Sequence, residues 1–131
     1  MNQVASRLAI VAAAFAASLL ATACSTYQAY DGEKRPRNEV AVIVGDYRIR
    51  AGAPISLYLR QVDGIDVPLT DHGADVLTGK HTLLVDCVLA ETHAISRHSV
   101  EVDVLAGYRY RLVAQTEPGM HACADVRAEA E

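Results

Sequence analysis

Apolar and polar residues alternate one by one along much of the chain after residue 39. Between Ile55 and Arg60, Ile, Leu and Leu alternate with Ser, Tyr and Arg, and between Val100 and Val104 valines alternate with Glu and Asp. Because successive side chains of a strand point to opposite faces, this period of two predicts strands that bury one face in a core. The alternation therefore predicts an all-β fold.

Short strands of this kind are separated by turn residues at intervals of roughly ten residues. Strands are predicted at residues 40–44, 47–50, 55–60, 65–67, 81–89, 100–104, 108–114 and 120–126. Six to eight such strands predict a small antiparallel β-sandwich, or a partly open barrel, over residues 39–127. Residues 68–80 are expected to be irregular, and residues 88–96 to form a long hairpin loop or a short helix. Residues 128–131 are expected to fray.

Residues 1–23 have the features of a secretory leader. Arg7 supplies a positive charge, and residues 8–20 form an uncharged, mostly apolar stretch. This stretch is shorter than the roughly 20 residues that a helix needs to cross a membrane, so it is interpreted as a signal segment and not as a permanent span.

The end of this leader resembles the lipobox of bacterial lipoproteins. The residues concerned are Leu19-Leu20-Ala21-Thr22-Ala23-Cys24-Ser25, in which Ala21 stands where the family usually has Leu. The resemblance implies that the Cys24 thiol is lipidated and becomes the mature N-terminus, and Ser25 resembles the class sorted to the outer membrane. An ordinary cleavage after Ala23, which would give a free secreted protein, is the alternative.

Residues 24–38 are polar and charged, and they are interrupted by Gly32 and Pro36. We interpret them as a flexible tether between the lipid and the folded domain.

Cysteine number supports this interpretation. The chain has three cysteines, and assigning Cys24 to lipid leaves Cys87 and Cys123 as a pair. Exported small domains favour disulfides, and closing this loop would stabilise the fold by about 4 kcal/mol on the chain-entropy model. Two reduced core thiols remain an alternative, as does a redox-active pair, although no Cys-x-x-Cys spacing is present.

Several short motifs carry a wider resemblance. They are Tyr27-x-x-Tyr30-Asp-Gly-x-x-Arg35-Pro36, Leu77-Thr-Gly-Lys-His-Thr82, which we interpret as a turn before a strand, and Leu105-Ala-Gly-Tyr-Arg-Tyr110. The chain resembles small uncharacterised proteobacterial lipoproteins with a transthyretin-like or PEGA-like β-sandwich domain. In that family a Pro often stands where this chain has Thr78. The resemblance implies a cell-envelope interaction module and supplies no catalytic residues.

No constellation of residues predicts catalysis, a cofactor or a metal. The serines Ser56, Ser96 and Ser99 have no evident base nearby in sequence. The histidines lack ligand spacing and are interpreted as solvated loop or strand-end residues: His72, His81, His93, His98 and His121. The acidic residues that crowd one region are interpreted as turn residues: Asp63, Asp66, Asp71 and Asp75. A net charge of -4, without a basic cluster, argues against a nucleic-acid partner.

Two functional hypotheses follow. The first is a non-enzymatic lipoprotein of the cell envelope, held on the outer membrane by lipid and facing the periplasm, whose domain docks on another envelope protein. The alternative is a periplasmic module that binds a metal, a glycan or a small apolar ligand. A concave pocket with convergent polar groups would favour the second, and a filled interior would favour the first.

Overall fold

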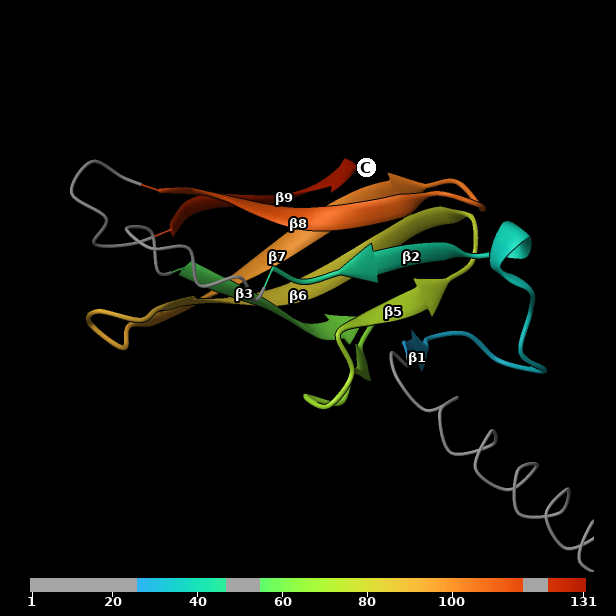
Figure 1. Cartoon of the computed structure of the whole chain (residues 1–131), viewed down its shortest axis with the longest axis horizontal. Helices are drawn as coiled ribbons and strands as arrows, with labels where there is room; N and C mark the ends of the chain where they lie inside the picture. The colour runs from blue at the N-terminus through green and yellow to red at the C-terminus, as the bar shows by residue number, and fades with distance from the viewer. Residues whose placement is uncertain (1–25, 47–54, 117–122) are drawn as a thin grey trace, which may run out of the picture.

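The computed structural model describes residues 26–46, 55–116 and 123–131. Within these residues the chain forms nine strands in two sheets that face each other, which confirms the predicted all-β sandwich (Figure 1). One sheet has five strands in the order β1-β5-β2-β8-β9: β1 Tyr27–Gln28, β5 Gly73–Val76, β2 Ala41–Val44, β8 Arg109–Thr116 and β9 Cys123–Ala130. The other has four in the order β4-β3-β6-β7: β4 Ile65–Asp66, β3 Ile55–Val62, β6 Gly79–Leu89 and β7 Ile95–Val104.

The pairing is antiparallel throughout the four-stranded sheet but mixed in the five-stranded sheet. Strand β2 pairs antiparallel with β5 on one side and parallel with β8 on the other, and β1 pairs parallel with β5. The described residues therefore form a sandwich that is mainly, but not wholly, antiparallel.

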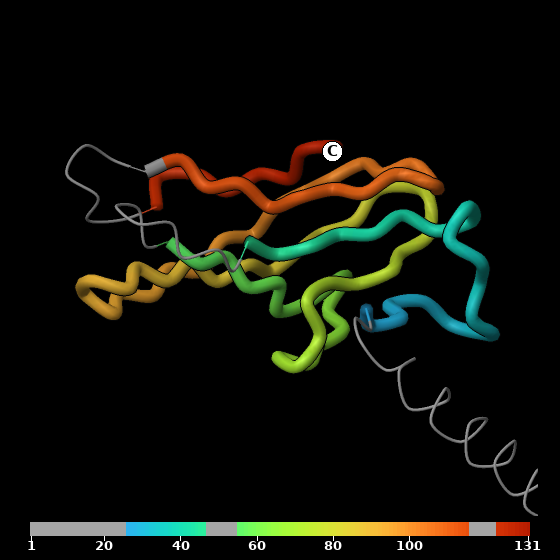
Figure 2. Tube along the Cα trace, in the orientation of Figure 1, coloured from blue at the N-terminus to red at the C-terminus, as the bar shows by residue number. Residues whose placement is uncertain are grey.

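The two sheets are aligned so that their edges correspond. Strand β7, at one edge of the four-stranded sheet, packs beside β9 at the edge of the five-stranded sheet. The opposite edges, β4 and β1, therefore lie on the same side of the sandwich, as the path of the tube indicates (Figure 2).

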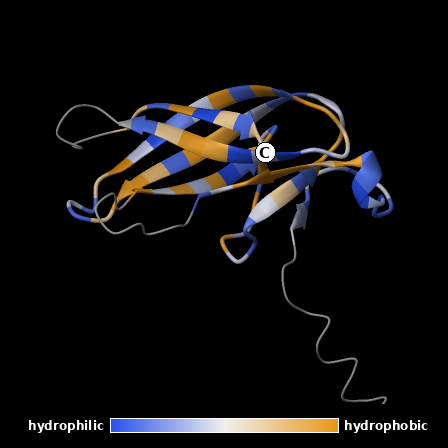
Figure 3. Cartoon of the chain, turned by 45° about the horizontal axis from the view of Figure 1, so that its top comes forward, coloured by the Kyte–Doolittle hydropathy of each residue, from blue (hydrophilic) through white to orange (hydrophobic). Residues whose placement is uncertain are grey.

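The core lies between the two sheets and is built from the alternating positions. In β6 the inward residues Leu83, Val85, Cys87 and Leu89 are all buried, as their period of two predicts. The corresponding alternation of apolar and polar colours runs along the strands in Figure 3. The largest fully buried side chains come from both sheets: Ile43, Leu57, Leu83 and Leu112. The interior of the sandwich is thus filled by side chains.

Part of the predicted tether is ordered and belongs to the sheet. Residues 27–28 form β1, and residues 37–39 form a single 3-10 turn, η1 (Arg37–Glu39). The prediction of a flexible segment over residues 24–38 is therefore wrong for these residues. Composition misleads here because an edge strand needs backbone hydrogen bonds more than apolar side chains, and β5 offers a free edge for them.

Three other boundaries differ from the predictions. Strand β5 lies within residues 68–80, which were expected to be irregular, because Gly73 and Asp75 are poor strand formers in isolation. Strand β6 begins at Gly79, before the predicted start at residue 81, so residues 79–80 are strand and not turn. Strand β7 begins at Ile95, so the hairpin connection is shorter than residues 88–96, and no helix occurs there.

The C-terminal residues are also more ordered than expected. Strand β9 continues to Ala130, so the prediction that residues 128–131 fray is wrong. Glu131 lies between Arg109 and Arg111 of β8 and forms ion pairs with both. The last predicted strand starts at Cys123 in the structure; residues 120–122 and the predicted strand at residues 47–50 lie outside the described residues.

Candidate functional site

The predicted lipidation site, Cys24, lies outside the described residues, which begin at Thr26. The Thr26 hydroxyl donates a hydrogen bond of 2.7 Å to the carboxylate oxygen Oδ1 of Asp75. Next to it, Tyr27 and Gln28 pair in parallel with Ala74 and Asp75. The chain is therefore fastened to β5 within two residues of Cys24.

Further contacts hold this N-terminal segment in place. The Ala29 amide donates to the Asp75 carbonyl at 2.9 Å, and Ala29 itself is buried in the core cluster. The Gln28 side-chain amide donates to the carbonyl oxygens of Tyr30 and Gly32. Asp75 was interpreted from the sequence as a turn residue, but it lies in β5, is buried, and accepts the Thr26 hydroxyl. No pattern in the sequence indicates this contact between residues 49 positions apart.

The two cysteines predicted to pair are joined by a disulfide. Cys87 lies on the inner side of β6 and Cys123 begins β9, so the bond connects one sheet to the other. Their Cα atoms are 6.6 Å apart, and both side chains are buried. This burial and pairing give the cysteines a structural role as a cross-link.

A half-buried histidine, His81, closes the turn between β3 and β4. Nδ1 of His81 lies 2.6 Å from Oδ2 of Asp63, and Nε2 lies 2.6 Å from the carbonyl oxygen of Leu77. The other oxygen of Asp63 accepts the Thr82 amide at 2.8 Å. Burial raises the pKa of Asp63, but the hydrogen bonds from His81 and Thr82 outweigh it, and the net pKa is lowered. The contacts of Asp63 with His81 and Thr82 hold the turn in place, which confirms the turn role predicted for Asp63. The prediction that His81 is a solvated residue is wrong, because both of its ring nitrogens face acceptors.

A second charged cluster lies on the outer face of the four-stranded sheet. The guanidinium of Arg97 donates two hydrogen bonds to the carboxylate of Asp86, at 2.8 and 3.2 Å. Arg60 approaches the same carboxylate at 3.7 Å. The hydrogen bonds from Arg97 lower the pKa of Asp86 against the effect of burial. Since these residues come from β3, β6 and β7, the cluster ties three strands together.

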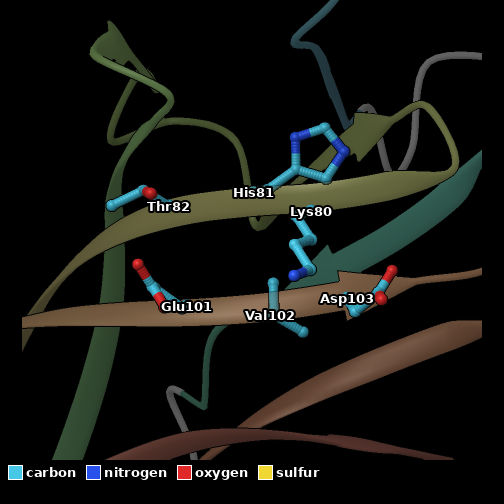
Figure 4. Close-up of a pocket in the computed structure, with 6 residues that line it drawn as sticks. All are labelled: Lys80, His81, Thr82, Glu101, Val102 and Asp103. Atoms are coloured by element: carbon cyan, nitrogen blue, oxygen red, sulfur yellow. The ribbon is translucent and has the colours of Figure 1, made fainter.

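One hollow in the described part of the surface lies across the β6–β7 ladder (Figure 4). It measures about 380 Å³ and is lined by three consecutive residues from each strand: Lys80, His81, Thr82, Glu101, Val102 and Asp103. Figure 4 shows the Lys80 and His81 side chains leaving the ladder in different directions. Lys80 pairs with Asp103 and Thr82 with Glu101, so these four polar side chains share the outer face of the sheet, whereas both ring nitrogens of His81 are taken up by Asp63 and Leu77.

The remaining histidines are dispersed. His72 precedes β5, His93 lies in the β6–β7 turn with a positive φ, and His121 is outside the described residues. Among the residues with described positions, no three His, Cys, Asp or Glu side chains are grouped so that they could hold a metal ion.

Ser96 and His98 form a side-chain pair that was not predicted from the sequence. The Ser96 hydroxyl lies 3.0 Å from Nε2 of His98 on the inner side of β7, because residues two apart share a face of a strand. In the described chain, no carboxylate bonds to His98 in the way that orients the base of a catalytic triad. The i, i+2 spacing was the available signal for this pair.

Comparison of the chain with protein-family models, with curated proteins and with solved structures found no match. What the fold defines is a class: a small two-sheet β-sandwich whose sheets are joined by a disulfide. No helix among the described residues is long and apolar enough to cross a membrane.

Proposed function

We propose that this protein is a membrane-anchored lipoprotein of a bacterial cell envelope and that its β-sandwich is a non-enzymatic docking module. The observation that carries the proposal is the disulfide between Cys87 and Cys123. Structural disulfides persist in oxidising compartments outside the cytosol, and residues 1–23 supply the matching export signal. Cys24, the one cysteine outside this pair, stands at the end of that signal, where lipidation takes place in lipoproteins.

A docking role is favoured over ligand binding because the space between the sheets is occupied by side chains. Buried residues from both sheets form one continuous cluster. The hollow on β6 and β7 is a surface feature with outward-pointing polar groups. A small domain with a filled core offers its edges and loops to a partner, and strand addition at an edge is a common mode of such recognition.

The proposed location is the periplasmic side of the outer membrane, with Ser25 as the sorting residue after Cys24. The partner is proposed to be another envelope protein, since a net charge of -4 does not favour nucleic acid. The domain needs no cofactor for this role.

The anchor is tested by mass spectrometry of the mature N-terminus after expression of the full precursor in a bacterium. The expected result is an N-terminal Cys24 that carries acyl chains, in protein recovered with the membrane fraction. The matched control is Cys24→Ala, which should leave the disulfide intact and release the protein from membranes. An unmodified Cys24 on a protein free in the periplasm would contradict the proposal.

The docking role is tested by crosslinking in intact envelopes, followed by affinity purification of the wild type and of Cys24→Ala. A specific envelope protein should be crosslinked to the wild type and be reduced in the variant, because the lipid concentrates the domain at its membrane. Recovery of no specific protein in either sample would argue against docking.

The ligand-binding alternative predicts heat on titration of the folded domain with zinc, copper or a glycan. Lys80, Glu101 and Asp103 give the surface hollow a mixed charge, which would suit a small polar ligand better than an apolar one. Tight, stoichiometric binding that is lost in Lys80→Ala and Glu101→Ala would favour this alternative over docking.

A further inference from the structure

We infer that one edge of the sandwich faces the lipid surface directly. This edge, called here the anchor edge, consists of β1, β4 and residues 67–72, which connect β4 to β5. The inference rests on the proposed lipidation of Cys24 and adds an orientation to it: the domain lies against the membrane by a defined side instead of moving freely on a long tether.

The first step is the attachment of Thr26. Its hydroxyl is bonded to Asp75, and the two residues that follow are paired with β5. Only Ser25 separates Thr26 from Cys24. Two residues of chain span at most about 7 Å, so a lipid on Cys24 would hold the β1 end of the domain at the level of the headgroups.

The second step is the register of β1. Tyr27 lies beside Ala74 and the strands run parallel, so Thr26 lies beside Gly73, the first residue of β5. The connection formed by residues 67–72 ends at this same point. The start of β1 and the end of this connection therefore meet at one place on the anchor edge (Figures 1 and 2).

The third step is the apolar character of this connection. Leu69 is 65% exposed and Ile65 of β4 is 42% exposed. The base of the connection is fixed, because Val67 is buried and its amide donates to the Arg60 carbonyl at 2.8 Å. Leu69 is thus an exposed apolar side chain on a connection that starts from the fixed residue Val67 and ends at Gly73, beside Thr26.

A lipid surface accounts both for the fastening of Thr26 to β5 and for the exposed apolar side chain of Leu69. Apolar side chains that lie at the headgroup and acyl boundary are removed from water, and the short link to Cys24 brings Leu69 within reach of that boundary. Ile95 is an exposed apolar residue far from the anchor edge. It is 67% exposed, but it lies on β7, at the edge of the four-stranded sheet opposite to β4. Three strand spacings, about 14 Å, separate the strands β4 and β7.

The chain contains no tryptophan, so a single introduced Trp reports its own surroundings. The experiment uses two variants of the full precursor, Leu69→Trp and Ile95→Trp, each expressed with its leader so that lipidation can occur. The purified proteins are placed in phosphatidylcholine vesicles with and without brominated acyl chains. Zwitterionic lipid is chosen because Asp66 and Asp71 on the anchor edge would be repelled by anionic lipid. Acylation of Cys24 is measured by mass spectrometry on the same samples.

The expected result is that Trp at position 69 shows a blue shift and loses emission with brominated lipid, whereas Trp at position 95 shows neither change. With Cys24 acylated, equal responses at the two positions, or none at position 69, would overturn the orientation and leave the lipoprotein proposal standing. A protein with unmodified Cys24 would overturn both. Circular dichroism of both variants establishes that each is folded, which is expected because both replaced side chains are exposed.

Discussion

His81 lies with Nδ1 at 2.6 Å from Oδ2 of Asp63, and it joins the β3–β4 turn to the first residues of β6. Its Nε2 faces the Leu77 carbonyl oxygen at the same distance. An acceptor thus stands opposite each ring nitrogen. Asp63 itself has a φ of 50°, a conformation that Asn also tolerates, so the carboxylate can be replaced without disturbing the turn.

Asp63→Asn removes the charged partner of His81 and should lower the free energy of unfolding at neutral pH. Solvent screens this half-exposed pair, so the expected loss is about 0.5–1 kcal/mol. Because the pKa of Asp63 is lowered by folding, its contribution is complete above the ordinary value of 3.8 and disappears as the pH falls through the lower folded-state value. Urea unfolding from pH 7 down to pH 2 should show wild type and variant converging at the acid end; a constant difference would contradict the assignment.

Removal of the disulfide should destabilise the domain strongly. The bond closes a loop of 36 residues between Cys87 and Cys123, which corresponds to about 4 kcal/mol on the chain-entropy model. Urea midpoints of the Cys87→Ala/Cys123→Ala variant, or of reduced protein, measure this loss. Cys24→Ala is the control, and it should unfold at the same urea concentration as the oxidised wild type. Two reactive thiols in unreduced Cys24→Ala protein would show that the bond is not formed.

The bond between Asp86 and Arg97 should contribute more than an ordinary surface ion pair. The Asp86 carboxylate is nearly buried and receives two hydrogen bonds from one guanidinium. A double-mutant cycle with Asp86→Ala and Arg97→Ala is expected to give a favourable coupling energy that lies clearly above the error of the measurement. The same cycle on Arg127 and Glu129, a pair exposed on β9, should give a value near zero. Equal coupling energies in the two cycles would show that the Asp86–Arg97 pair contributes no more than an exposed ion pair.

Gly73 is required by the close approach of β2 to β5. A Cβ atom at this position would lie 2.2 Å from the carbonyl oxygen of Ile43, which belongs to the backbone of the paired strand and cannot move aside. Gly73→Ala should therefore cost about 2 kcal/mol or more in stability, as overpacking does. Thermal unfolding measures the effect, with Ser99→Ala on the exposed side of β7 as a control that should change little. An unchanged midpoint for Gly73→Ala would show that β5 can shift away.

The apolar alternation was sufficient to predict the sandwich because burial of one face is a local property of each strand. The hairpin at Asp63 and Gly64, the buried face of β6 and the cysteine pair were all predictable in this way. The polar contacts between side chains could not be predicted in this way. The spacing of Ser96 and His98 was visible, and it places both side chains on one face of β7, but it does not decide whether their atoms meet.

The sequence by itself determined the all-β class, the alternating core and the choice of cysteines that could pair, since these follow from composition and from a period of two along the chain. Only the tertiary structure decided that residues 27–28 are a strand of the sheet, because a polar segment becomes a strand when a free backbone edge is available to it. The edge of β5 is formed by residues almost fifty positions away, and the bond from Thr26 to Asp75 exists only once that edge has been assembled.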